Sequence, residues 1–196
     1  MAVLAFLIVG CFFAVGADAA DARDEDRKQL LRVFDEIVAG INEQNIERMV
    51  AQMDENATVV WLNAEVSRGH TEIRSYYRKM VNSSGAEDAI LTKYLTQAKV
   101  AAPARFLGDI AVADGTMADE FFPIRRGPFK LNSNWSVTCV KRDGQWKIAH
   151  LHLSTNVFNN ELLDESKQLV WYAGGGGLLA GLALMFVIGR LKRRGA

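Results

Sequence analysis

Two histidines in the second half of the chain, His150 and His152, are the residue types best suited to chemistry near neutral pH. They stand two residues apart in an apolar, strand-like segment, so we expect both imidazoles on the same face of a sheet. Because histidine titrates near neutrality, two imidazoles on an apolar wall could orient a carbonyl or a carboxylate, or transfer a proton. The residue types slightly favour the alternative that both side chains are structural and hydrogen-bonded near the last strand.

A hairpin predicted from the sequence gives these histidines their partners. The dipeptide Asp143-Gly144 predicts a two-residue turn, because such turns need positive φ values that this pair tolerates. Counting outward from the turn pairs Val137 with His150 and Trp135 with His152. This register predicts that Trp135 and both histidines share one face of the sheet.

Two further aromatic residues, Trp61 and Tyr76, belong to the same prediction. Aromatic side chains at such positions are more typical of a core, but they could also shape a pocket. The predicted ligand pocket therefore consists of Trp61, Tyr76, Trp135, His150 and His152, with His150 and His152 as the candidate catalytic residues.

The sequence predicts neither a metal site nor a cofactor site. A zinc site would need a third and a fourth ligand beside the two histidines. The pattern does not bring Asp114, Asp119 or Glu120 to them. The sequence also lacks a catalytic Ser-His-Asp order, a phosphate-binding loop and a paired-cysteine motif.

The charge balance argues against nucleic acid as a partner. The chain holds 23 basic and 23 acidic residues. Its dense basic cluster, from Arg190 to Arg194, directly follows an apolar run, as expected for the cytoplasmic flank of a membrane span.

Both ends of the chain are apolar, and both have the pattern of export and anchoring. Residues 1–19 predict a signal peptide, ending in the Ala-x-Ala form at Ala17-Asp18-Ala19, although an uncleaved anchor stays open because the usual basic start is missing. Residues 169–189 predict a transmembrane helix, followed by a basic cytoplasmic tail at 190–196. We therefore expect a single-pass cell-membrane protein whose main domain, residues 24–160, lies on the extracytoplasmic (periplasmic) side and is joined to the span by a linker at 161–168.

The middle of the chain predicts an α+β fold. Apolar residues recur at helical spacing between residues 24 and 41, Asn45 is a plausible N-cap for a second short helix, and residues 71–80 predict a third. Residues 57–62 predict a strand, and four further strands are expected at 90–101, 110–122, 129–141 and 145–154. Helices followed by a run of antiparallel strands indicate helices packed on one face of a curved sheet.

Three stretches resemble the SnoaL-like branch of the nuclear transport factor 2-like superfamily: residues 34–53, residues 55–77 and the hairpin at 135–154. The hairpin is also similar to the calcium/calmodulin-dependent kinase association domain. The resemblance implies a cone of helices against a strongly bent, mostly antiparallel sheet, with a pocket at the open end. In the ketosteroid isomerase branch a catalytic carboxylate stands on the first strand, whereas residues 59–62 here contain no acid.

Three functions follow from this resemblance and from the apolar ends. The first is a membrane-anchored domain that binds a small, mostly apolar ligand in its pocket. The second is an isomerase, cyclase or dehydratase that uses His150 or His152 as its acid or base. The third is a non-catalytic module that assembles as a homodimer. The fold alone does not choose among them.

Overall fold

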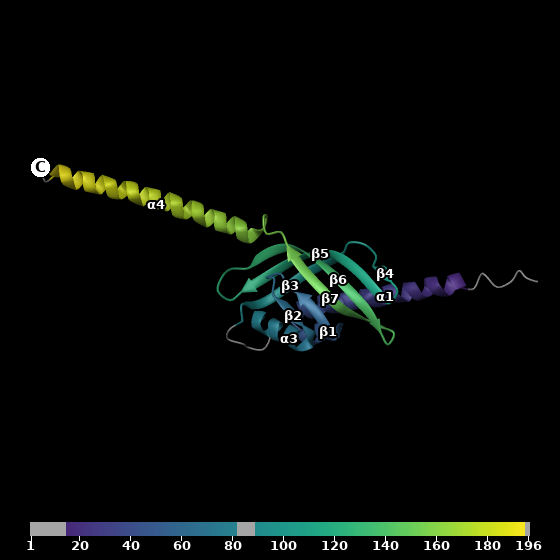
Figure 1. Cartoon of the computed structure of the whole chain (residues 1–196). Helices are drawn as coiled ribbons and strands as arrows, with labels where there is room; N and C mark the ends of the chain where they lie inside the picture. Colours follow the sequence, from purple (N-terminus) through teal and green to yellow (C-terminus); the bar gives the residue numbers. More distant parts are fainter. Residues whose placement is uncertain (1–14, 82–88, 195–196) are drawn as a thin grey trace, which may run out of the picture.

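The computed structural model describes residues 15–81 and 89–194, and it places three helices against one curled sheet (Figure 1). The hydrophobic part of the predicted signal peptide lies outside these residues. The helices and strands follow one another along the chain in the order α1 (Val15–Asn42), α2 (Ile46–Val50), β1 (Met53–Val60), β2 (Val66–Arg68), α3 (Gly69–Met80), β3 (Leu91–Val100), β4 (Arg105–Leu107), β5 (Ile110–Pro123), β6 (Phe129–Arg142), β7 (Gln145–Thr155) and α4 (Glu161–Arg194).

The seven strands form one mixed sheet in the order β2-β1-β7-β6-β5-β3, with β4 paired to β5. The β1–β7 pair is parallel and the other named pairs are antiparallel. Helices packed on such a sheet confirm the predicted α+β fold class. The sequence pattern missed only the two shortest strands, β2 and β4, which have three residues each and are too short to show a period.

The helix α1 covers one face of the sheet, which we call the inner face. The helix carries apolar residues at three- and four-residue steps, including Phe34, Ile37 and Ile41, and these side chains pack against the core. Its last turn leads directly to Asn45, whose side chain accepts a 3.1 Å hydrogen bond from the backbone N–H of Arg48. The predicted N-cap of α2 is thus confirmed.

The β6–β7 hairpin turns at Asp143-Gly144 as predicted, with positive φ at both residues. Its register, however, shifts further along. Cys139 pairs with Ile148 but its neighbour Thr138 pairs with His150, so Ala149 is the extra residue of a β-bulge. Because of this one-residue shift, each β7 side chain from His150 onward points to the face opposite to the predicted one. The predicted pairs Val137–His150 and Trp135–His152 are therefore wrong: Val137 pairs with Leu151 and Trp135 with Leu153.

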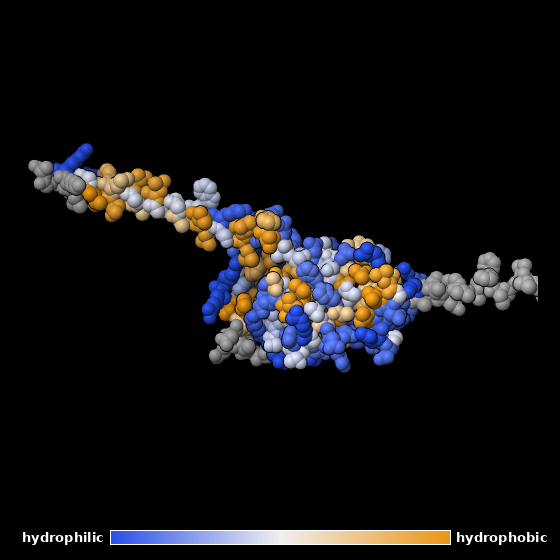
Figure 2. All heavy atoms as spheres, viewed as in Figure 1, coloured by the Kyte–Doolittle hydropathy of each residue, from blue (hydrophilic) through white to orange (hydrophobic). Residues whose placement is uncertain are grey.

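The helix α4 leads away from the domain (Figures 1 and 2). Its segment Glu161–Arg190 is long and apolar enough to cross a membrane, and it is the one such helix among the described residues. Its central side chains are not buried against the domain. Its first turns contact the domain: Arg126, in the β5–β6 connection, donates a hydrogen bond to Glu165, and the backbone N–H of Lys130 in β6 donates one to Glu161.

Candidate functional site: an apolar cavity beneath α1

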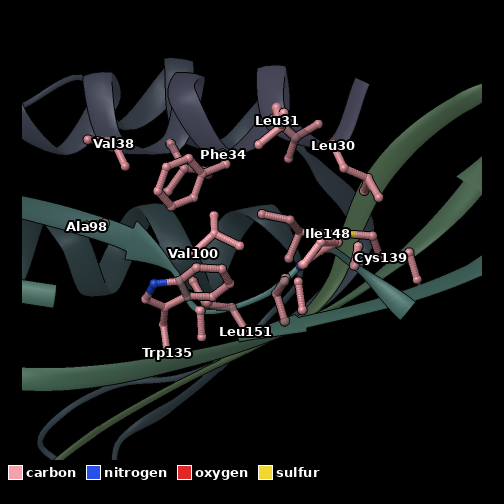
Figure 3. Close-up of a pocket in the computed structure, with 18 of the residues that line it drawn as sticks. Leu30, Leu31, Phe34, Val38, Ala98, Val100, Trp135, Cys139, Ile148 and Leu151 are labelled. Atoms are coloured by element: carbon pink, nitrogen blue, oxygen red, sulfur yellow. The ribbon is translucent and has the colours of Figure 1, made fainter. Parts of the chain in front are cut away.

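A cavity of about 480 Å³ lies between α1 and the inner face of the sheet (Figure 3). The volume lies within the usual range for small-molecule sites. Apolar side chains make up nearly all of its lining, which comprises Arg27, Leu30, Leu31, Val33, Phe34, Ile37, Val38, Ile41, Ala98, Val100, Ala101, Ala102, Pro103, Ala104, Ala111, Ala113, Met117, Trp135, Val137, Cys139, Ile148 and Leu151.

Small residues on the strands leave the space that the cavity occupies. Ala98, Ala111 and Ala113 stand on β3 and β5, opposite the larger side chains of α1. A helix and a sheet that both carried large residues here would fill the gap between them. The amphipathic helix and the alanines of the sheet together produce a cavity instead of a continuous core.

Gly115 positions the largest side chain of the cavity floor. A Cβ at this glycine would lie 2.6 Å from Cζ2 of Trp135, the residue with which Gly115 pairs across β5 and β6. The indole therefore rests directly on the glycine backbone. From above, Phe34 of α1 approaches the indole with a ring-centroid distance of 5.6 Å. Trp135 is thus held from both sides, and only 7% of it is exposed.

The rim of the cavity is apolar as well. Residues 101–104, which read Ala-Ala-Pro-Ala, connect β3 to β4 beside it. Leu31 on α1 is 53% exposed, and Val100 at the end of β3 is 36% exposed. A ligand that enters here would pass apolar side chains first, which favours molecules with little surface polarity.

Among the described residues that line the cavity, two carry side chains that can ionise. Arg27 lies at the edge, where it donates a 3.0 Å hydrogen bond to Asp24. Cys139 lies on the floor, and burial raises the pKa of its thiol to about 12. The rest of the lining is apolar, which suits the binding of an apolar molecule.

A family model for the SnoaL-like domain matches residues 30–158, which is more than half of the chain. The chain belongs to the SnoaL-like domain family. The matched segment includes the cavity floor and nearly all of the cavity-facing part of α1, and it ends before α4. A comparison with curated protein sequences gives no match.

Solved structures share the fold of this SnoaL-like domain at low sequence identity. A proposed scytalone dehydratase from Novosphingobium aromaticivorans is 16% identical, with a TM-score of 0.59, and the match covers 70% of this chain and 89% of that one. The hexachlorocyclohexane dehydrochlorinase LinA-type3 from Novosphingobium barchaimii is 12% identical, with a TM-score of 0.59 and coverage of 71% and 92%. A proposed calcium/calmodulin-dependent protein kinase II association domain from Xanthomonas campestris is 18% identical, with a TM-score of 0.50 and coverage of 65% and 86%.

Of the five side chains predicted to line a pocket, Trp135 lies in this cavity of the SnoaL-like domain, and the other four lie outside its lining. Trp61 and Tyr76 stack on each other, with ring centroids 4.1 Å apart. The Trp61 indole donates a 2.9 Å hydrogen bond to Ser67, and the Tyr76 hydroxyl donates to Asn63. Their contacts tie α3 to β1 and the β1–β2 connection.

The two histidines lie on the outer face of the sheet because of the bulge at Ala149. His150 is half-buried between Thr58 of β1 and Thr138 of β6, and the exposed His152 lies between Val60 and Ser136. The predicted placement of both imidazoles beside Trp135 is thereby corrected. Within the described ranges, no group of three His, Cys, Asp or Glu side chains is arranged to hold a metal ion.

Sequence reasoning missed the residues that build most of the cavity wall. The sequence pattern predicts the apolar face of α1, but it does not predict a cavity beneath that face. A signal was present in the alanines at 98, 111 and 113, because small residues in consecutive strands leave room opposite a helix with large ones.

Proposed function

We propose that this SnoaL-like domain binds a small, mostly apolar molecule in the cavity beneath α1, and that α4 anchors the domain to a membrane with its bulk on the extracytoplasmic side. The observation that carries the binding proposal is the composition of the lining. Apolar surface that a ligand removes from water contributes roughly 25 cal/mol per Å² to binding, before the cost of association.

The apolar lining supports ligand binding as the function of this cavity. The relatives named above include a dehydrochlorinase and a proposed dehydratase, but at 12% and 16% identity they inform on the fold alone. A proton-transfer enzyme needs an acid or base with a pKa near the working pH, within hydrogen-bonding reach of its substrate. Burial raises the pKa of the Cys139 thiol to about 12, and His150 and His152 face away from the cavity.

The membrane proposal rests on α4 and on the charges that follow its apolar segment. The most apolar part of the segment Glu161–Arg190 is not buried against the domain, as a soluble core helix would be. Basic residues then follow at Arg190, Lys192, Arg193 and Arg194. Because basic flanks are retained in the cytoplasm, this order supports an extracytoplasmic domain.

The binding proposal is tested on the whole chain in lipid nanodiscs, with propylbenzene as the probe. Isothermal titration calorimetry, with empty nanodiscs subtracted, should detect saturable binding. Ala113→Leu places three more carbon atoms on the cavity floor and should weaken binding at least tenfold. Ala118→Leu makes the same change on the exposed outer face of the same strand and should leave binding unchanged. Unsaturable uptake, or equal affinities of the two variants, would reject the proposal.

A further inference from the structure

A group of buried polar atoms without hydrogen-bond partners lies next to the apolar cavity. In the described part of the chain, five buried side-chain atoms have no partner: Tyr77 Oη, Thr96 Oγ1, Asp119 Oδ2, Ser133 Oγ and Trp135 Nε1. Each of these residues is less than 10% exposed. Buried polar atoms are nearly always hydrogen-bonded. Several unpaired atoms in one region therefore indicate a place where a polar atom of a ligand binds.

The strand register brings these residues together. Thr96 of β3 pairs with Asp119 of β5, and Ser133 of β6 pairs with Met117, two residues before Asp119 on the same face. Directly opposite residues have Cα atoms roughly 5 Å apart. We call Thr96, Asp119, Ser133 and the Trp135 indole nitrogen the polar group.

One oxygen of Asp119 is already engaged. The Tyr94 hydroxyl donates a 2.8 Å hydrogen bond to Oδ1. Burial, and next the negative charge of Asp119, raise the pKa of Tyr94 well above its usual value, so this hydroxyl keeps its proton and remains a donor. Asp119 Oδ2 is left as an acceptor that still needs a donor.

The polar group borders the cavity at one end. Ala98, Met117 and Trp135 line the cavity, and each stands two residues along its strand from Thr96, Asp119 and Ser133, respectively. Alternate residues share a face, so the polar side chains continue the cavity floor. In Figure 3 the indole nitrogen of Trp135 lies on the Ala98 side of the ring, away from Cys139 and Ile148. The nitrogen therefore points toward the part of the floor that leads to Thr96.

The chemistry of these atoms selects the group that would bind. The indole N–H of Trp135 can only donate, whereas a carboxylate oxygen such as Asp119 Oδ2 accepts. An ammonium ion would satisfy only the carboxylate, and a ligand carboxylate would satisfy only the donors. A hydroxyl both donates and accepts, so it matches both requirements at once.

We propose that the polar group binds the hydroxyl of an apolar alcohol or phenol whose hydrocarbon part occupies the cavity. This inference rests on the proposed binding function and names its ligand class. Met117 lies between the cavity and Asp119 on β5, and its flexible side chain could adapt to ligands of different width.

A matched pair of probes tests the proposal on the whole chain in nanodiscs: 4-propylphenol and propylbenzene, which differ by one hydroxyl. The ratio of their dissociation constants is measured by isothermal titration calorimetry. Asp119→Asn turns the free acceptor into an amide donor, and Ser133→Ala removes one hydroxyl. We expect each variant to lower the preference for the phenol about tenfold, while propylbenzene binds as before. Asp114→Asn, on the exposed outer face of the same strand, should change neither affinity.

The outcomes separate the two proposals. If propylbenzene binds but the preference for 4-propylphenol is the same in the natural chain, Asp119→Asn and Ser133→Ala, the hydroxyl site is wrong and the apolar binding function stands. If neither probe binds the natural chain, both proposals are wrong. If Asp119→Asn does not fold, Ser133→Ala and the similarly shaped Thr96→Val decide the question.

Discussion

The side chain of Lys141, in β6, donates a 2.7 Å hydrogen bond to the carboxylate of Asp26, in α1. The indole N–H of Trp146 donates to the same carboxylate oxygen at 2.9 Å, and only 5% of Asp26 is exposed. Burial by itself would raise the pKa of Asp26, but the hydrogen bonds from Lys141 and Trp146 outweigh it and lower the pKa. This contact fixes α1 over the β6–β7 hairpin, and so it holds the helix that covers the cavity.

Replacing Asp26 should therefore destabilise the domain in a pH-dependent way. We expect Asp26→Asn to lower the free energy of unfolding by about 2–4 kcal/mol at pH 7, because Lys141 and Trp146 lose a buried partner. A lowered pKa contributes stability above the unfolded-state pKa of about 3.9, and that stability is lost as the pH falls through the folded-state value. Thermal unfolding followed by circular dichroism should show a weaker pH dependence below pH 4 in the variant.

The control for this experiment is Asp24→Asn, which breaks an exposed ion pair with Arg27. Surface pairs of this kind contribute less than about 1 kcal/mol. Equal losses in the two variants would show that Asp26 does not fix α1.

The bulge at Ala149 leads to a second prediction, about neighbouring residues of β7. His152 is exposed on the outer face, whereas Leu151 is 9% exposed and lines the cavity. We expect His152→Ala to change the free energy of unfolding by less than about 0.5 kcal/mol and to leave propylbenzene binding unchanged. Leu151→Ala should cost about 2–3 kcal/mol of stability, because it removes buried hydrocarbon. A large loss of propylbenzene binding in His152→Ala would contradict this prediction and show that His152 contributes to the binding site.

The sequence predicted the fold class, the N-cap at Asn45 and the turn at Asp143-Gly144, because each depends on local residue preferences. The register beyond the turn depends on one extra residue, and alternation counted from the turn carries no information about it. A sign of the bulge was nevertheless present. The apolar residues Ile148 and Leu151 are three apart, whereas an unbroken strand would repeat them at two or four.

The cavity was less predictable than the fold. Whether the apolar face of α1 meets a filled core or an open space depends on how far the helix lies from the sheet. The contact of Asp26 with Lys141, which joins residues 115 positions apart, helps to set that distance. A pattern with a period of a few residues does not contain such long-range information.

A third prediction concerns topology. Alkaline phosphatase, which is active only outside the cytoplasm, should be active when fused after Lys167, the last charged residue before the proposed span. A green fluorescent protein fused after Ala196 should fluoresce in the cytoplasm, because the basic residues at 190–194 resist translocation. An inactive phosphatase after Lys167 would place the SnoaL-like domain on the cytoplasmic side.

The last prediction concerns Gly115, where the backbone of β3 and the indole of Trp135 both lie close to β5. A Cβ at this position would lie 2.0 Å from the backbone oxygen of Lys99 in the neighbouring strand and 2.6 Å from the indole of Trp135. The oxygen belongs to the backbone and moves only with the strand, so Gly115→Ala should cost on the order of 3 kcal/mol of unfolding free energy. The displaced indole should also weaken propylbenzene binding. Gly127→Ala is the matched control, since a Cβ there would meet nothing within 4 Å, and it should change stability by less than about 0.5 kcal/mol. If Gly115→Ala is as stable as Gly127→Ala and binds propylbenzene equally well, the close packing of Trp135 against β5 does not shape the cavity floor.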